Sequence, residues 1–273
     1  MSVNTTLPNT LTPEESLVLR QGAVALIDAL GFRGIWSKAE PAAIVAQLRT
    51  ARVRAANEVN LQSFLRPNSL HISSFSDTLF VGGTVSEDED LAGIVHRVAL
   101  AVASIQSTQL DAPVPLNYRG CISVGEVMIG HDFFVGQPVD DAATLYEQAQ
   151  AAVVWLTPST RQALDERHLG LTLFEWTVPL KSGPLKTLVA NPFAAIAYEQ
   201  IHALNLAAID MLIPAFMRPF RASRAVEVVQ KEQNTSAFLD AARQFTVDNF
   251  DAVSNAYLEE QAQAQEDYQN GLL

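Results

Sequence analysis

Cysteine, cationic side chains and long apolar runs are scarce in this sequence of 273 residues. Cys121 is the only cysteine, which excludes an intrachain disulfide and any zinc or iron–sulfur site built from clustered cysteines. The 18 Lys and Arg residues are outnumbered by 30 Asp and Glu residues, so nonspecific attraction to nucleic acid or to an anionic membrane is not expected. The most apolar late segment, Leu204 to Phe220, contains Asp210 and Arg218 and is too short for a membrane-spanning helix.

The N-terminal stretch Met1 to Thr12 is polar and has no basic region leading into an apolar core. No secretory signal is therefore expected, and the predicted location is the cytoplasm. Hydrophobic residues make up 48% of the chain, which is typical of a globular protein with a substantial core.

One carboxylate stands out within this apolar material. Asp28 directly follows the run Ala23 to Ile27 and precedes the turn residue Gly31. An ionised Asp that is buried alone costs several kcal/mol, so Asp28 needs a cation, a hydrogen-bond donor or water beside it. A capped turn and a metal ligand both satisfy that need.

The hydrophobic periodicity predicts an α+β protein whose sheet carries helices on one face. We divide the chain into a lead-in with a short helix (1–20), a central domain (21–192) and a helical extension (193–273), because helix-favouring residues dominate the last part. The predicted elements, in order, are a strand at Ala23–Ile27, one long or two shorter helices at Glu40–Phe64, a hairpin at Ser69–Val81, a helix at Leu91–Thr108, a strand at Leu116–Ser123, a helix at Val139–Ala151, a strand at Val153–Leu156, a helix at Thr157–Arg167, and strands at Phe174–Leu180 and Leu185–Val189.

A second carboxylate, Asp77, lies at the tip of the predicted hairpin. If the strand that precedes Asp28 pairs with this hairpin, the two carboxylates become neighbours. Hard divalent cations prefer oxygen ligands, and two such ions between paired carboxylates can activate a hydroxyl and neutralise a departing phosphate. Two unrelated turn aspartates remain the simpler interpretation of the spacing alone.

Five motifs in sequence resemble the catalytic domain of class III nucleotidyl cyclases. The resemblance covers Gln21 to Pro192 and implies a ferredoxin-like βααββαβ domain with a C-terminal helical extension outside it. The motifs are Ile27–Phe32, Phe75–Leu79, Arg119–Val127, Val135–Val139 and Leu180–Lys186.

The resemblance implies a lyase reaction in which the ribose 3′-hydroxyl attacks the α-phosphorus and pyrophosphate leaves. It assigns two divalent ions, Mn²⁺ or Mg²⁺, to Asp28, Asp77 and the backbone carbonyl of Ala29. It also implies a homodimer with two active sites at the interface, where one protomer supplies the metal aspartates and the other contacts the base.

The same resemblance gives a set of residues that contact the substrate. The loop that contains Phe32 and Arg33 would present backbone N–H groups to the triphosphate, as glycine turns can do. Lys186 matches the family lysine that pairs with phosphate oxygens, although a surface lysine is an equally good interpretation of the sequence alone.

The positions that read the base differ from both purine patterns of the family, which are lysine with aspartate or glutamate with cysteine. Ser73 and Phe133 stand there instead. A hydroxyl donates or accepts and a phenylalanine fills volume or stacks, so the pair suits a smaller base. The chain therefore resembles the pyrimidine cyclases of bacterial Pycsar anti-phage systems, whose cyclic nucleotide activates a separate effector protein. UTP is favoured over CTP because neither position has a carboxylate to accept from the cytosine amino group.

A second departure concerns the charge on the transferring phosphorus. Purine cyclases place an asparagine and an arginine where this chain has Asp140 and Thr144. Losing that cation costs on the order of 3 to 4 kcal/mol of transition-state stabilisation unless another group replaces it. Arg119 and Arg33 are the candidate substitutes, and for Arg119 a structural ion pair is the competing interpretation. A cyclase fold that has lost catalysis and senses nucleotides or dimerises is the main alternative, and a purine cyclase with a rebuilt pocket is the other.

Overall fold

The computed structural model describes residues 18–30, 32, 35, 39–62, 70–86, 89–108, 114–130, 133–164, 170–199, 201–220 and 225–269. Arg33 and the lead-in helix predicted before residue 18 lie outside the described residues. Of the helices in these ranges, none is long and apolar enough to cross a membrane.

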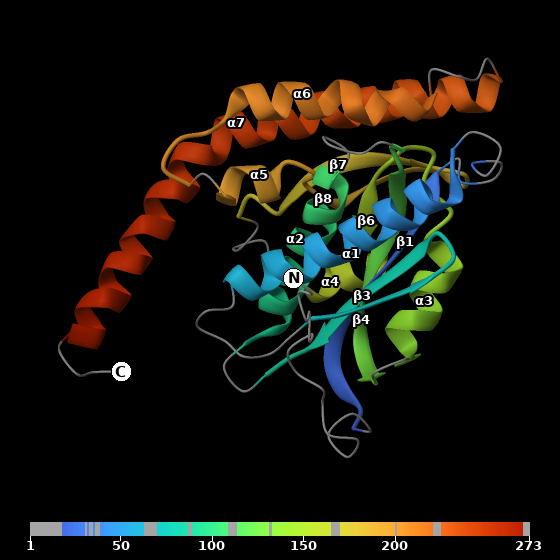
Figure 1. Ribbon diagram of the computed structural model, residues 1–273. Helices are drawn as coiled ribbons and strands as arrows, with labels where there is room; N and C mark the ends of the chain where they lie inside the picture. Colours follow the sequence, from blue (N-terminus) through green and yellow to red (C-terminus); the bar gives the residue numbers. More distant parts are fainter. Residues whose placement is uncertain are drawn as a thin grey trace, which may run out of the picture.

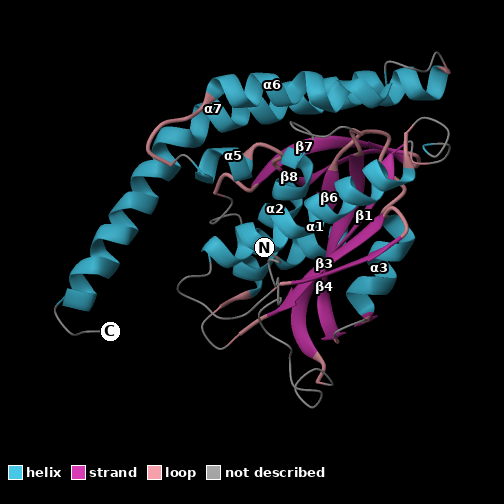
Figure 2. Ribbon diagram, in the orientation of Figure 1, coloured by secondary structure: helices cyan, strands magenta, loops and turns pink. Residues whose placement is uncertain are grey.

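An eight-stranded sheet forms the centre of the molecule (Figure 2). Its strand order is β2-β3-β1-β4-β6-β8-β7, and β5 pairs with β4 beside this path. β4 and β6 pair in parallel, and the other neighbouring strands are antiparallel. The strands are β1 (Arg20–Leu30), β2 (His71–Phe75), β3 (Thr78–Thr84), β4 (Asn117–Ile129), β5 (Phe134–Gly136), β6 (Val154–Leu156), β7 (Leu173–Leu180) and β8 (Gly183–Ala190).

Strand β1 lies in the middle of this sheet because its residues are apolar on both sides. Ala25 and Ile27 pack into one core cluster, whereas Leu26 and Leu30 pack into another on the opposite face. Next to it, Gly120 of β4 lets the two backbones approach, since a Cβ there would lie 2.1 Å from the carbonyl oxygen of Leu26.

Helices cover both faces of the sheet (Figure 1). The first face carries α1, α2 and α4, and the second carries α3, α6 and α7. The helices are α1 (Pro41–Gln62), α2 (Leu91–Ser107), α3 (Gln137–Leu145), α4 (Pro158–Ala163), α5 (Ala194–Glu199), α6 (Leu206–Met217) and α7 (Val226–Gln269), with a short 3₁₀ turn at Arg218–Phe220.

The predicted α+β class and the C-terminal helical extension are confirmed. The expectation of helices on only one face is wrong, because α6 and α7 bury apolar side chains against the second face. Phe238 of α7, for example, stacks on Phe174 of β7 with ring centroids 5.9 Å apart. Of the two predictions for residues 40–64, the single long helix is correct, and the hairpin with Asp77 in its turn is also confirmed.

Candidate active site

Asp28 and Asp77 come together where β1 meets the β2–β3 hairpin. Asp28 lies opposite Thr78 of β3, and the backbone N–H of Ala29 donates to the carbonyl oxygen of Asp77 at 3.3 Å. The two-residue turn that carries Asp77 places Ser76 at a φ of 57°, a region that non-glycine residues seldom adopt. The pairing of β1 with β3 thus produces the two-carboxylate corner that the spacing allowed.

The electrostatics of this corner are unbalanced. The pKa of Asp28 is raised to about 6, first because the side chain is largely buried and second because Asp77 is negatively charged. The positive charge of Arg119 and a 3.3 Å hydrogen bond donated by the Thr78 hydroxyl oppose this rise without cancelling it. The two carboxylates therefore lie in a place with too little positive charge.

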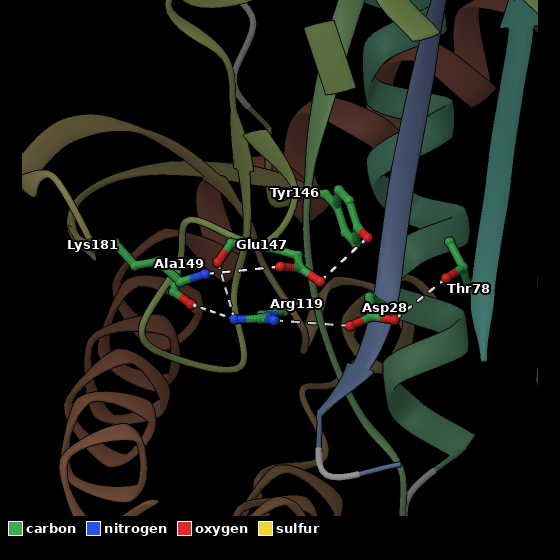
Figure 3. Close-up of polar contacts among 7 residues, drawn as sticks. All are labelled: Asp28, Thr78, Arg119, Tyr146, Glu147, Ala149 and Lys181. Atoms are coloured by element: carbon green, nitrogen blue, oxygen red, sulfur yellow. Dashed lines mark hydrogen bonds and ion pairs between the residues drawn. The ribbon is translucent and has the colours of Figure 1, made fainter. Parts of the chain in front are cut away.

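Arg119 of β4 lies directly opposite Asp28 in the sheet. Its Nη1 donates to the carbonyl oxygens of Glu147 and Ala149, at 3.1 and 3.3 Å, while its Nη2 is 3.9 Å from Oδ2 of Asp28 (Figure 3). The residue is 8% exposed, and its buried Nε has no hydrogen-bond partner among the described residues. The guanidinium is thus held mainly by main-chain oxygens, with one edge turned toward the carboxylate.

Thr78, Tyr146 and Glu147 also belong to this site, although the sequence analysis did not select them. The Tyr146 hydroxyl donates to Oε1 of Glu147 at 3.3 Å, and Oε2 of Glu147 is 3.8 Å from Nζ of Lys181 (Figure 3). Thr78 could have been found, since it follows Asp77 directly. The other two come from the turn after α3, where no motif marks them.

The donor atoms at this corner fit a divalent cation. Two carboxylates and the Ala29 carbonyl, which also accepts from the Phe32 N–H at 3.4 Å, are the oxygen ligands that Mg²⁺ and Mn²⁺ prefer. The raised pKa of Asp28 supports this fit, because a cation there would supply the missing charge. Within the described ranges no group of three or more His, Cys, Asp or Glu side chains is placed to hold a metal, so the remaining ligands would be water and substrate oxygens.

Ser73 lies on the same sheet face as Asp28. Ser73 is the cross-strand partner of Phe80, and Asp28 is the cross-strand partner of Thr78. Because Thr78 and Phe80 are two residues apart on β3, their side chains and those of their partners lie on the same face. The ring of Phe80 stacks on Phe134 with centroids 5.9 Å apart. Ser73 is therefore half-buried beside an aromatic pair that no motif in the sequence marks.

Phe133, the other predicted base contact, lies outside that aromatic pair. Its side chain is 41% exposed, and its ring lies against Gly130, whose N–H donates to the Phe133 carbonyl at 2.9 Å. The ring of Phe133 is therefore not part of the Phe80–Phe134 stack that neighbours Ser73.

Lys186 and Phe32 are directed away from Asp28. Lys186 lies on the same face of β8 as Leu188 and Ala190, which pack in the first-face core. Its Nζ is 2.6 Å from Oε1 of Glu175. The Phe32 side chain is 7% exposed and packs in the same first-face core. Within one chain, only the backbone of Phe32 is near the carboxylates, and the Lys186 ammonium belongs to the opposite face of the sheet.

The exposed face of α3 carries Asp140 and Thr144 in place of an amide and a cation. Both residues are exposed, and the Thr144 hydroxyl donates to the Asp140 carbonyl oxygen at 2.9 Å, within the same helix. Neither side chain can therefore offer a positive charge to a substrate.

Comparisons with known proteins give a fold likeness only. No protein-family model and no curated protein matches the sequence. Among solved structures, the guanylate cyclase domain of RhGC from Catenaria anguillulae in complex with GTP aligns with a TM-score of 0.46 and 15% sequence identity. The alignment covers 63% of this chain and 96% of that chain. The adenylyl cyclase CyaB from P. aeruginosa aligns with a TM-score of 0.41 and 15% sequence identity, over 63% of this chain and 94% of that chain.

A third solved structure is described as a class III adenylyl cyclase-like ATP-binding protein from Pseudomonas aeruginosa. It aligns with 21% identity over 53% of this chain and 34% of that chain, with a TM-score of 0.38. Likenesses of this size assign no roles to residues of this chain.

Proposed function

We propose that this chain is a metal-dependent nucleotidyl cyclase that converts a pyrimidine nucleoside triphosphate, UTP in preference to CTP, to its 3′,5′-cyclic monophosphate and pyrophosphate. The observation that carries the proposal is the carboxylate corner. Asp28 and Asp77 lie together at the end of a buried strand, and the pKa of Asp28 is raised to about 6 by burial and by the neighbouring charge. Such a pair suits divalent ions that bind triphosphate.

The reaction forms a bond between the ribose 3′-oxygen and the α-phosphorus, breaks the bond from that phosphorus to the bridging oxygen, and releases the hydroxyl proton. Two divalent ions held by Asp28, Asp77 and the Ala29 carbonyl would supply hydroxyl activation and neutralise the departing pyrophosphate. Thr78 orients Asp28 by donating to its Oδ1. We assign to Arg119, whose Nη2 lies 3.9 Å from Oδ2 of the same carboxylate, the role of stabilising the negative charge that develops on the transferring phosphorus.

The pyrimidine preference is supported by the surroundings of Ser73. Its hydroxyl can donate to or accept from a base edge, and the stacked rings of Phe80 and Phe134 lie beside it, surroundings that we interpret as favouring a small base. Phe133 retains its predicted role only if its exposed ring faces a base from a second protomer.

A homodimer with shared sites completes the proposal. Lys186 lies on the face opposite Asp28 in its own chain, so its predicted phosphate contact requires a second protomer. By its resemblance to Pycsar cyclases, the enzyme is proposed to act in the bacterial cytoplasm as the source of an anti-phage second messenger that activates a separate effector protein. The domain boundaries at residues 20 and 192 are part of the same proposal.

One observation favours the alternative of a nucleotide-binding module without catalysis. Asp140 and Thr144 present no cation on α3, and Arg119 is tied to main-chain oxygens. The retention of both carboxylates is the reason that we favour the enzyme over this alternative.

Incubation of the protein with Mn²⁺ and each of the four ribonucleoside triphosphates, followed by mass spectrometry, tests the proposal. The expected result is cyclic UMP as the dominant product, with less cyclic CMP. Cyclic AMP or cyclic GMP as the dominant product would overturn the pyrimidine preference and leave the cyclase assignment. Triphosphate binding without any cyclic product would overturn the enzyme in favour of the binding module.

A further inference from the structure

The turn between α3 and β6, residues 146–152, connects the C-terminal extension to the candidate site. We propose that Thr235 and Asn234 of α7 are positioning residues that fix this turn, and that the turn in this way holds the guanidinium of Arg119 away from Asp28. The inference rests on the proposed function in one respect: it explains how Asp28 stays available as a metal ligand.

The turn is held on two sides. From α7, the Thr235 hydroxyl accepts from the Ala152 N–H at 2.9 Å, and Nδ2 of Asn234 donates to the Gln150 carbonyl at 2.9 Å. Thr235 is fully buried, so this contact is shielded from water. From the β7 side, Gln150 donates its N–H to the Pro179 carbonyl at 2.7 Å, the Lys181 N–H donates to the Gln148 carbonyl at 2.9 Å, and Ala149 forms a bridge with Leu180. The turn is therefore held by α7 as well as by the end of β7.

The fixed turn determines where Arg119 points. The two carbonyls that accept from Nη1 belong to Glu147 and Ala149, within the turn itself. With Nη1 engaged there, Nη2 stays 3.9 Å from Oδ2 of Asp28, whereas a charge-assisted hydrogen bond has a length of about 2.7–2.9 Å. Arg119 is thus close enough to attract negative charge but does not close on the carboxylate.

Loosening the turn removes this restraint. The Nη1 hydrogen bonds weaken, and the guanidinium then gains more by pairing with the ionised Asp28, whose one ion pair among the described residues is the 3.9 Å contact with Arg119 itself. An Arg119–Asp28 pair at hydrogen-bond distance occupies the oxygen atoms that a metal needs. The consequence is a weaker metal site, although α7 touches no metal ligand.

Two buried threonines of α7 provide a matched comparison. Thr235→Val removes the acceptor for the turn, and Thr246→Val removes an equally buried hydroxyl that accepts from Asn191 Nδ2 at 2.9 Å, three helical turns away. Thr235→Ser keeps the acceptor. Asn234→Ala, which deletes the less buried of the two contacts, serves if Thr235→Val does not fold.

Crystal structures of these variants and Mn²⁺ titration followed by electron paramagnetic resonance form the test. In Thr235→Val we expect the Nη2–Oδ2 distance to fall to hydrogen-bond length and the affinity for Mn²⁺ to fall about tenfold, as for partners that orient metal ligands. Thr235→Ser and Thr246→Val should bind Mn²⁺ like the wild type, even where thermal unfolding shows lower stability. In an Arg119→Gln background, Thr235→Val should cause no further loss.

An Arg119 position unchanged by Thr235→Val, or by Asn234→Ala in its place, would overturn the inference. Equal losses of Mn²⁺ affinity in Thr235→Val and Thr246→Val would overturn it as well. If the wild type binds no Mn²⁺, the two-metal function fails, and the crystal structures still decide by themselves whether α7 positions Arg119.

Discussion

The carboxylate corner and the exposed face of α3 lie on the same side of the sheet, yet they hold very different chemistry. At the corner, Asp28 and Asp77 are brought together by the pairing of β1 with β3, and they lack a matching cation. On α3, Asp140 and Thr144 offer no cation at all. The only positive charge at hydrogen-bond or ion-pair distance from Asp28 in the described structure is Arg119, at 3.9 Å. The turn at residues 146–152 holds its guanidinium there.

In the function proposed above, metal binding and charge stabilisation belong to different parts of the site. The proposed metal-binding part, Asp28 and Asp77, depends on the pairing of two adjacent strands. The proposed charge-stabilising residue, Arg119 of β4, depends on the turn that α7 contacts.

Asp28→Asn and Asp77→Asn each remove one carboxylate from the corner. We expect cyclase activity to fall by at least about a thousandfold, because the proposed metal site loses one of its two carboxylate ligands. The unfolding midpoint of Asp28→Asn at neutral pH should be equal to or above that of the wild type, since a half-buried acid crowded by Asp77 has been neutralised. Asp251→Asn, on the exposed surface of α7, is the control. Turnover at the wild-type rate in either corner variant would remove the metal assignment.

Mixing Asp28→Asn with Lys186→Ala tests whether a site is shared between two protomers. Each variant alone is expected to be inactive or nearly so. In an equal mixture about half of the dimers contain one protomer of each variant, and one of the two sites in such a dimer has both native residues. Activity should therefore return to about a quarter of the wild-type level. No recovery on mixing would mean that Lys186 does not act across an interface.

Arg119→Lys and Arg119→Gln examine the charge that we place opposite the corner. Loss of the cation in the Gln variant should lower kcat about a hundredfold, while Lys should retain part of the activity because it keeps the charge without the planar geometry. Arg243→Gln on α7 removes an exposed arginine paired with Asp210 and should leave kcat unchanged. A kcat in Arg119→Gln equal to the wild-type value would return Arg119 to a purely structural role.

Ser76→Gly relaxes the turn that carries Asp77. Ser76 has a φ of 57°, which glycine adopts without strain, so the free energy of unfolding should rise by about 0.5–1 kcal/mol. Denaturant unfolding measures this change. If the variant is less stable, the turn is not strained in solution, and the geometry of the corner would need to be reconsidered.

The sequence was sufficient for the parts of the molecule whose causes are local. Asp28 stands out because it ends an apolar strand, and Asp77 because it occupies a hairpin turn, so their elements could be predicted. Their proximity was expected only if β1 paired with the hairpin, a pairing that the spacing alone did not establish. The α+β class followed in the same way from hydrophobic periodicity.

The parts that were missed depend on contacts between residues far apart in the chain. Nothing near Tyr146 or Glu147 indicates that their turn meets Arg119, and nothing near Thr235 indicates that it holds that turn. The sheet face of Lys186 depends on strand register, which one alternating strand cannot define without its neighbours. The packing of α7 on the second face likewise depends on rings such as Phe174 and Phe238 meeting across the fold.

A crystal structure with Mn²⁺ and a non-reactive UTP analogue tests the central claim most directly. Anomalous scattering locates the metal without reference to activity. We expect manganese peaks in contact with carboxylate oxygens of both Asp28 and Asp77, with the analogue's phosphate oxygens completing the coordination. Analogue bound without manganese at these two carboxylates, or manganese bound elsewhere, would contradict it.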